Sequence, residues 1–314
     1  MTPKPQPLIA LIGATATGKT ALALELYDRY PVHLINVDAT QIYRGMDIGS
    51  AKLSRDELAR YPHALIDILD PEESYSAAQF CDDATREIQS AWAKGKIPVL
   101  VGGTMMYYHA LFTGLNELPN ANPTLREQLQ QRLLHEGNEA LWQELQRHDP
   151  ESAQRISPND SQRLIRLLEL FYTTGEPASA LFAKQTQTRP HWQVLGISLQ
   201  LERALLHERI AKRFHLMVEQ GFEEEVMRLK ARPQLQPNAP SMKSAGYREF
   251  WAYLDGECSR AQAIEQSIIH TRQLAKRQIT WQNNRLKSAL PLITVDALNP
   301  STSLEIIQRF IENL

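Results

Sequence analysis

Residues 13–20 have the spacing G-x-x-x-x-G-K-T, which suits the binding of a phosphate chain. The eight residues are Gly13, Ala14, Thr15, Ala16, Thr17, Gly18, Lys19 and Thr20. An apolar run precedes them and a helix-forming run follows, so backbone N–H groups and the positive end of a helix would surround a phosphate. Lys19 would add a point charge, and Thr20 a hydroxyl ligand for Mg²⁺. The motif predicts phosphate binding, with a ligand-free glycine turn as the alternative, and it leaves the phosphate compound open.

An aspartate, Asp38, follows the second apolar run of the chain. A carboxylate at this strand end would face a phosphate bound next door, where it could order Mg²⁺ or act as a general base. A turn or helix-capping role is the alternative. Asp38 alone does not separate a kinase from another transferase, because small-molecule P-loop kinases also use an acid there.

The fourth apolar run ends in Gly102, Gly103 and Thr104, with no acidic residue at the position that many NTPases use for a metal-binding aspartate. The two glycines allow close backbone approach, and Thr104 offers a hydroxyl. Residues 105–107, Met-Met-Tyr, favour a place in the core, although they would also suit an apolar substrate group.

Cations concentrate in the second half of the chain. Arg213, in a charged helical stretch, could close on a phosphate chain as a bidentate donor, although spacing alone favours a solvent-facing charge. Residues 266–295 contain no acid and carry a net charge of +5, from Arg272, Lys276, Arg277, Arg285 and Lys287. In a chain of net charge −2 this segregation indicates a nucleic-acid footprint, with a merely solvated basic face as the alternative. Tyr247 could stack on an exposed base.

The sequence predicts an α/β fold, in which a parallel β-sheet flanked by helices positions these residues, because short apolar runs alternate with helical patterns. The expected strands are residues 8–12, 33–37, 64–69, 97–101, 193–199 and 292–295. Since ligands bind at the carboxyl ends of parallel strands, residues 13–20, 38–43 and 102–107 should converge on one site. The alternation stops near Asn116, and residues 117–189 show only helical segments. We therefore expect a P-loop core of residues 1–116 and 190–314 and an all-helical insertion domain of residues 117–189.

Composition bounds the class of protein. Hydrophobic residues make up 43 % and charged residues 22 % of 314 residues, as in ordinary globular proteins. Two distant cysteines, Cys81 and Cys258, argue against a disulfide framework and a structural zinc site. No secretory pattern and no run of about 20 apolar residues occurs, so we expect a cytoplasmic protein without a membrane partner.

Taken together, these stretches resemble the bacterial tRNA dimethylallyltransferases, also called tRNA isopentenyltransferases. The resemblance covers nearly the whole chain. It rests on the phosphate loop, residues 38–43, Met-Asp-Ile-Gly at 46–49, Gly-Gly-Thr at 102–104, Pro-Asn-Asp at 158–160 with Arg163, Gly-Tyr-Arg at 246–248 and the segment 271–281.

The resemblance implies transfer of a dimethylallyl group from dimethylallyl diphosphate to N6 of adenosine 37, beside the anticodon of a tRNA, by a magnesium-dependent enzyme. We expect a monomer. By resemblance, Asp38 is the general base, and Lys19, Thr20 with its Mg²⁺, and Arg213 hold the departing diphosphate. Other residues are implied to contact the tRNA together with Asp38: Ala39, Thr40, Gln41, Thr104, Arg126, Gln162, Arg163, Leu164, Ile165, Arg166, Lys243, Ser244, Ala245, Gly246, Tyr247, Arg248, Lys276, Arg277, Gln278, Ile279, Thr280, Trp281, Gln282 and Asn283.

Two positions depart from the family pattern, which has proline and serine where this chain has Ala14 and Ala39. Ala39 puts one polar contact to RNA in doubt, for which Thr40 offers a substitute hydroxyl. Two rival functions share part of the pattern. A small-molecule kinase using ATP would need the loop and the acid but no basic helix. An RNA-binding protein with a nucleotide switch would bind tRNA without making a product.

Overall fold

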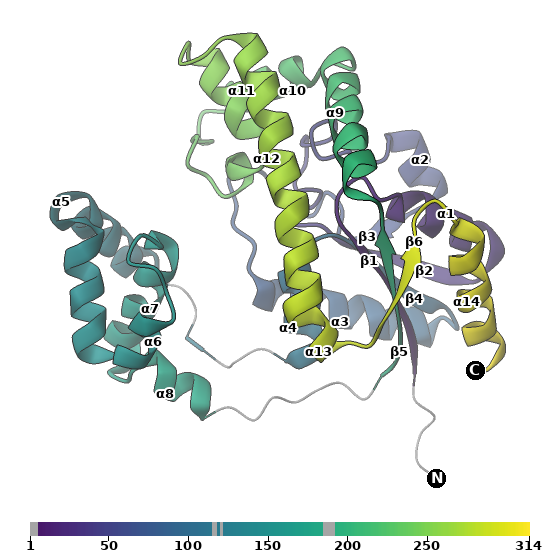
Figure 1. The fold of residues 1–314 in the computed structure, drawn as a ribbon, viewed down its shortest axis with the longest axis horizontal. Helices are drawn as coiled ribbons and strands as arrows, with labels where there is room; N and C mark the ends of the chain where they lie inside the picture. The colour runs from purple at the N-terminus through teal and green to yellow at the C-terminus, as the bar shows by residue number, and fades with distance from the viewer. Residues whose placement is uncertain (1–5, 115–117, 120–121, 185–191) are drawn as a thin grey trace. The chain divides into compact units, whose positions relative to one another are not determined.

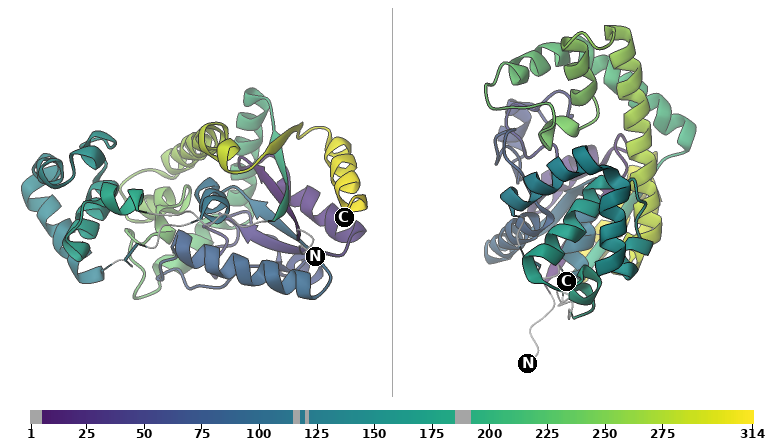
Figure 2. Two further views of the ribbon diagram at one scale, coloured as in Figure 1. Left: turned by 90° about the horizontal axis from the view of Figure 1, so that it is seen from below. Right: turned by 90° about the vertical axis from the view of Figure 1, so that its left-hand side faces the viewer.

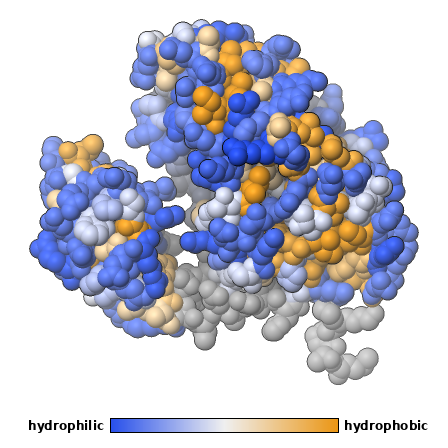
Figure 3. All heavy atoms as spheres, viewed as in Figure 1, coloured by the Kyte–Doolittle hydropathy of each residue, from blue (hydrophilic) through white to orange (hydrophobic). Residues whose placement is uncertain are grey.

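A computed structural model describes residues 6–114, 118–119, 122–184 and 192–314. The chain divides into two compact units, one of Met1–Thr113 with Pro190–Leu314, and one of Gly114–Arg189 (Figure 1). On the face drawn in Figure 3, hydrophilic residues are interrupted by apolar patches, which are more extensive on the larger unit. Cys81 and Cys258 are free thiols. In the parts that the structure describes, no helix is both long and apolar enough to cross a membrane.

The larger unit is built on a six-stranded sheet in the order β3-β2-β4-β1-β5-β6. The strands are β1 (Pro7–Gly13), β2 (Val32–Val37), β3 (His63–Ala64), β4 (Ile97–Gly102), β5 (Gln193–Gln200) and β6 (Leu292–Asp296). Every pairing is parallel. The predicted parallel sheet flanked by helices is therefore confirmed.

Both faces of the sheet are covered, which explains why its strands read as continuous apolar runs. Leu8, Ala10 and Ile12 of β1 pack on one face with α3 (Ala77–Ala93) and α4 (Met105–Thr113). Ile9 and Leu11 pack on the other face with α1 (Lys19–Arg29) and α14 (Pro300–Glu312). Figure 2 shows this layered arrangement from two further sides.

The strand expected over residues 64–69 is wrong in its extent, since β3 ends at Ala64. Leu65 and Asp67 adopt positive φ angles of 63° and 54°, which no strand accommodates. The apolar letters Leu65 and Ile68 are instead part of a turn that packs against the neighbouring helices. The hydrophobic pattern thus indicated burial correctly but not the backbone conformation.

A second cluster of helices stands over the carboxyl end of the sheet (Figure 1). It consists of α9 (Arg203–Glu219), α10 (Phe222–Lys230), the short helix η1 (Ser241–Lys243), α11 (Tyr247–Leu254) and α12 (Arg260–Trp281). These helices share a core of their own with the loop that follows β2. After α12 the chain makes a π-helical turn, η2 (Gln282–Leu286), and a short helix, α13 (Lys287–Ala289). One more short helix, α2 (Arg55–Arg60), precedes β3.

The smaller unit is all-helical in its described residues. Its helices are α5 (Pro123–His148), α6 (Pro150–Gln154), α7 (Ser161–Thr174) and α8 (Ala178–Ala183), and α5 is kinked at Gly137. The Asn122 side chain caps α5, with proline in the first turn, a position at which proline's missing N–H costs nothing. Leu164, Leu167 and Leu168 of α7 belong to the core of this unit, which holds the four helices together.

Candidate active site

The phosphate loop connects β1 to α1, and its shape depends on Gly18. Gly18 has a φ of 93°, a left-handed conformation that side-chain-bearing residues rarely adopt. The Thr17 hydroxyl donates to the carbonyl oxygen of Ala14 at 2.8 Å. The loop is thereby fixed around the first turn of α1, where unpaired backbone N–H groups favour an anion.

Lys19 folds back into this loop. Its Nζ donates to the carbonyl oxygens of Gly13 at 2.9 Å and Ala14 at 2.8 Å. The pKa of Lys19 is lowered to about 8, chiefly by burial; the charge of Asp38 opposes this shift, and the charge of Arg213 adds to it. The ammonium therefore sits among dipoles that an incoming phosphate oxygen can replace.

Arg213 reaches the same loop from α9. Its Nη2 donates to the Thr15 hydroxyl oxygen at 2.5 Å. Burial lowers the pKa of Arg213, and the charge of Asp38 opposes this shift. Although Arg213 and Thr15 are 198 residues apart, α9 carries the guanidinium to the edge of the loop. Sequence spacing alone favoured a solvent-facing charge here, and that reading is wrong.

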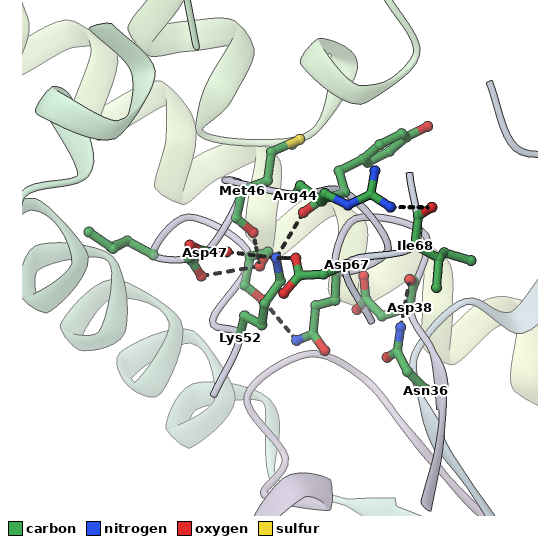
Figure 4. Close-up of polar contacts among 12 residues, drawn as sticks. Asn36, Asp38, Arg44, Met46, Asp47, Lys52, Asp67 and Ile68 are labelled. Carbon is green, nitrogen blue, oxygen red and sulfur yellow. Dashed lines mark hydrogen bonds and ion pairs between the residues drawn. The ribbon is translucent and has the colours of Figure 1, made fainter. Parts of the chain in front are cut away.

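Asp38 lies at the carboxyl end of β2, beside the loop. Its Oδ1 accepts a hydrogen bond of 2.9 Å from the backbone N–H of Thr40, which fixes the carboxylate. The Asn36 side-chain amide donates to the carbonyl oxygens of Asp38 and Leu65, and so fastens the strand end to the following turn (Figure 4). Thr104, at the start of α4, accepts the N–H of Ala39 at 3.0 Å.

Two cavities meet at Asp38. The smaller one, of ≈ 330 Å³, is lined by the phosphate loop, including Lys19 and Thr20. The larger one, of ≈ 650 Å³, has a mixed wall of apolar and cationic side chains. Six residues line both cavities: Thr15, Asp38, Ser50, Gly103, Arg213 and Gln278. The carboxylate thus stands between a phosphate-binding space and a wider space that could take a second substrate.

The apolar part of the wider cavity comes from α4, α9 and α12. It includes Ile210, Phe214, Met217, Leu274 and Trp281. The cationic part consists of Arg213, Lys243, Arg248 and Arg277, and His270 also lines this cavity. Met105 and Tyr107 are buried, as their residue types favour, whereas Met106 is 51 % exposed and lines this cavity.

A family model described as IPP transferase matches residues 41–285. The chain belongs to this family. It is 55 % identical to a tRNA dimethylallyltransferase of Dichelobacter nodosus over 302 residues, covering 96 % of this chain and 95 % of that protein.

Solved structures of related proteins agree with the family assignment. A full-length tRNA isopentenylpyrophosphate transferase of Bacillus halodurans matches with a TM-score of 0.70 and 34 % identity, covering 99 % of this chain and 96 % of that one. A eukaryotic dimethylallyltransferase described as acting on tRNA matches with a TM-score of 0.83 and 26 % identity, covering 98 % of this chain and 80 % of that one.

Sequence reasoning missed two buried charges in this IPP transferase, Lys52 and Glu225, which hold the loop after β2. Lys52, whose side chain is 1 % exposed, donates to the carbonyl oxygen of Tyr43 and to the carboxylates of Asp47 and Asp67 (Figure 4). Its three N–H donors therefore each have an acceptor. The only sequence signal was that Lys52 follows the Met-Asp-Ile-Gly stretch closely.

Glu225, on α10, holds the other side of that loop. Its carboxylate accepts the backbone N–H groups of Asp47 at 3.0 Å, Ile48 at 2.8 Å and Gly49 at 3.1 Å. The Tyr247 hydroxyl donates a fourth hydrogen bond at 2.7 Å. Nothing in the acidic run Glu223–Glu225 distinguishes Glu225 by sequence, because all three glutamates suit the first turn of a helix.

Several residues implied to contact RNA face the interior instead. Tyr247 is fully buried, so the expectation that it stacks on a base is wrong: its ring packs on Phe222 and its hydroxyl is used by Glu225. Gln282 is buried and donates to Ser198. Leu164 and Ile165 lie in the core of the helical unit. These side chains face inward because each one covers apolar surface or satisfies a buried polar atom.

The remaining implied RNA contacts differ in their exposure. In the larger unit, Thr40 and Gln41 are half-buried beside the cavities, Gly246 is buried, and Ser244 and Ala245 line the wider cavity. Lys276, Thr280 and Asn283 are exposed, and Ile279 is half-buried. In the helical unit, Gln162 and Arg163 are exposed, whereas Arg126 and Arg166 both donate to the buried carboxylate of Glu169.

Proposed function

We propose that this chain transfers a dimethylallyl group from dimethylallyl diphosphate to N6 of adenosine 37 of tRNA, forming N6-(dimethylallyl)adenosine and diphosphate. Membership of the IPP transferase family favours prenyl transfer to tRNA over phosphoryl transfer by a small-molecule kinase. The observation that carries the proposal is the place of Asp38 between the phosphate-binding cavity and the wider cavity.

The residues of this site suit each part of the reaction. The C–O bond to the diphosphate breaks, a C–N bond to N6 forms, and one N6 proton leaves. Lys19, Arg213 and the loop N–H groups would stabilise the departing anion, because they are fixed before it develops its charge. Asp38 would accept the proton, which removes the obstacle of a nitrogen lone pair conjugated with the adenine ring. The apolar wall of Ile210, Phe214 and Met217 would keep water from the allylic group.

Magnesium fits the donor set of the smaller cavity. The Thr20 hydroxyl and the Asp38 carboxylate both line that cavity. Mg²⁺ is commonly bound by one or two protein oxygens, with substrate phosphates and waters as its other ligands. In the described ranges, no three or more His, Cys, Asp or Glu side chains form a metal cluster of their own, which suits such a shared site. When bound, the ion would neutralise charge on the diphosphate.

The tRNA anticodon stem-loop is the proposed second substrate. Exposed cations of the larger unit, Lys243, Arg248, Lys276 and Arg277, would contact its phosphates beside the wider cavity. We also propose that the helical unit acts as an RNA-binding domain through Arg126, Arg163 and Arg166. The target base must leave its stack to reach Asp38, which costs a few kcal/mol that these contacts would offset.

A single incubation tests this proposal. The protein is mixed with Mg²⁺, dimethylallyl diphosphate and an anticodon stem-loop carrying adenosine at positions 36 to 38, and the RNA is analysed by mass spectrometry. We expect a gain of one five-carbon prenyl unit on adenosine 37. An RNA of unchanged mass, under conditions where inorganic diphosphate binds, contradicts the proposal. Replacing the prenyl donor with ATP should give no phosphorylated product. This result distinguishes prenyl transfer from the phosphoryl transfer of a kinase.

A further inference from the structure

Gln278 of α12 connects the phosphate loop to the end of β4. Its Oε1 accepts the backbone N–H of Thr15 at 2.9 Å, and its Nε2 donates to the carbonyl oxygen of Gly103 at 2.8 Å. These partners lie 263 and 175 residues away in the sequence. The amide therefore joins two strand ends that share no side-chain hydrogen bond in the described residues.

The absence of a side chain at Gly103 is what gives the Gln278 amide its space. A Cβ added at Gly103 would lie 2.5 Å from Gln278 Nε2 and 3.4 Å from the carbonyl oxygen of Gly13. Since Gly103 does not have a positive φ, an alanine fits the backbone there but displaces the amide. The glycine and the glutamine thus form one structural unit.

Thr15 is held from two helices at once. Gln278 of α12 takes its N–H, and Arg213 of α9 donates to its hydroxyl. Both of these side chains, together with Asp38, line the boundary between the two cavities. One turn on either side of Gln278, Leu274 and Trp281 of α12 line the wider cavity.

We propose that Gln278 is a positioning residue, which orders the phosphate loop for the diphosphate through Thr15 and Gly103. This inference rests on the proposed function only for the identity of the prenyl donor. Without the two hydrogen bonds, the Thr15 N–H has no fixed partner, although Thr17 and Lys19 still hold the Ala14 carbonyl of the same peptide. The loop is then less well ordered, and binding the anion must complete its ordering. The resemblance implied a direct RNA contact at Gln278; the structure shows that one acceptor site and one donor of its amide serve contacts within the protein.

The test measures binding of inorganic diphosphate with Mg²⁺ by calorimetry. Gln278→Met keeps the length of the side chain but removes both hydrogen bonds, and we expect about tenfold weaker binding at unchanged stoichiometry. Gln278→Glu keeps an acceptor for Thr15 but adds a negative charge beside the anion, so it should bind more weakly than Gln278→Met. Gln266→Met, on an exposed position of the same helix, is the matched control and should bind within twofold of the wild type.

Gly103→Ala provides a second route to the same state, since it displaces the amide without changing Gln278. We expect a similar loss of diphosphate affinity. The double variant Gly103→Ala/Gln278→Met should bind diphosphate no more weakly than Gln278→Met alone, because both substitutions remove the same contact. A merely structural role predicts lower thermal stability with unchanged diphosphate affinity in the folded fraction.

Unchanged affinity in Gln278→Met overturns the assignment, as does full additivity in the double variant. A wild-type chain that binds inorganic diphosphate but transfers no prenyl group refutes the proposed function and leaves the Gln278 result valid. A wild-type chain that does not bind inorganic diphosphate overturns both.

Discussion

The Lys19 ammonium donates a hydrogen bond of 2.9 Å to the carbonyl oxygen of Gly13, within the loop that it is expected to serve. The loop thus holds its own cation in place before any phosphate arrives. Because this position is desolvated, the pKa of Lys19 falls from its ordinary value to about 8. The charge needed for diphosphate binding is therefore lost at a pH where an exposed lysine would keep it.

Diphosphate affinity should consequently depend on pH through Lys19. Below pH 8 the free protein carries the charged ammonium; as the pH rises through about 8 the proton is lost, and binding must take it up again. We expect affinity to decline between pH 8 and 9.5. Calorimetry on wild type and Lys19→Met measures this, since the difference between them cancels the ionisation of the ligand. Parallel pH profiles for the two proteins contradict the prediction.

Asp38→Asn should reduce prenyl transfer by about 10²- to 10⁴-fold, because an amide cannot accept the N6 proton. The asparagine oxygen can still accept the Thr40 N–H, so the strand end should keep its shape. Single-turnover kinetics measures the loss, and a filter-binding assay should give RNA affinity within twofold of the wild type. Asp56→Asn, at an exposed position of α2, is the control. Near-normal turnover in Asp38→Asn would show that Asp38 is not the general base.

Glu225→Gln should lower the free energy of unfolding by about 3 kcal/mol. In the wild type, three backbone N–H groups share the buried carboxylate, whereas the glutamine amide would direct an N–H donor of its own towards them. Urea denaturation measures the change. Glu224→Gln, the exposed neighbour on the same helix turn, should cost less than about 0.5 kcal/mol. Equal effects in the two variants would show that the loop does not depend on Glu225.

Arg163→Ala should weaken RNA binding several-fold and reduce the slope of log affinity against log salt by about 1, as expected for one lost phosphate contact. Its ion pair with Asp160 lies on the surface and contributes little to folding. Arg155→Ala removes a comparable exposed arginine of the same unit, paired with Glu151, and should leave RNA affinity unchanged. Salt titration of stem-loop binding compares the two variants.

The sequence predicted most of the sheet because parallel strands buried on both faces are apolar at most positions. Residues 8–12, 33–37 and 97–101 all lie within strands of the structure. The segment 64–69 has the same apolar composition, but positive φ angles at Leu65 and Asp67 make it a turn. Composition reports burial, whereas the backbone conformation of a short segment depends on what packs around it.

The sequence by itself determined the phosphate loop, the acid after the second strand and the family, because each depends on residue types at short, fixed spacing. Only the tertiary structure decided which distant side chains complete the site. Arg213 and Gln278 reach Thr15 from helices about 200 residues or more away. Glu225 and Tyr247 form a buried pair under the loop. A single sequence records no such contacts, since burial and pairing of a charge depend on packing between elements rather than on local pattern.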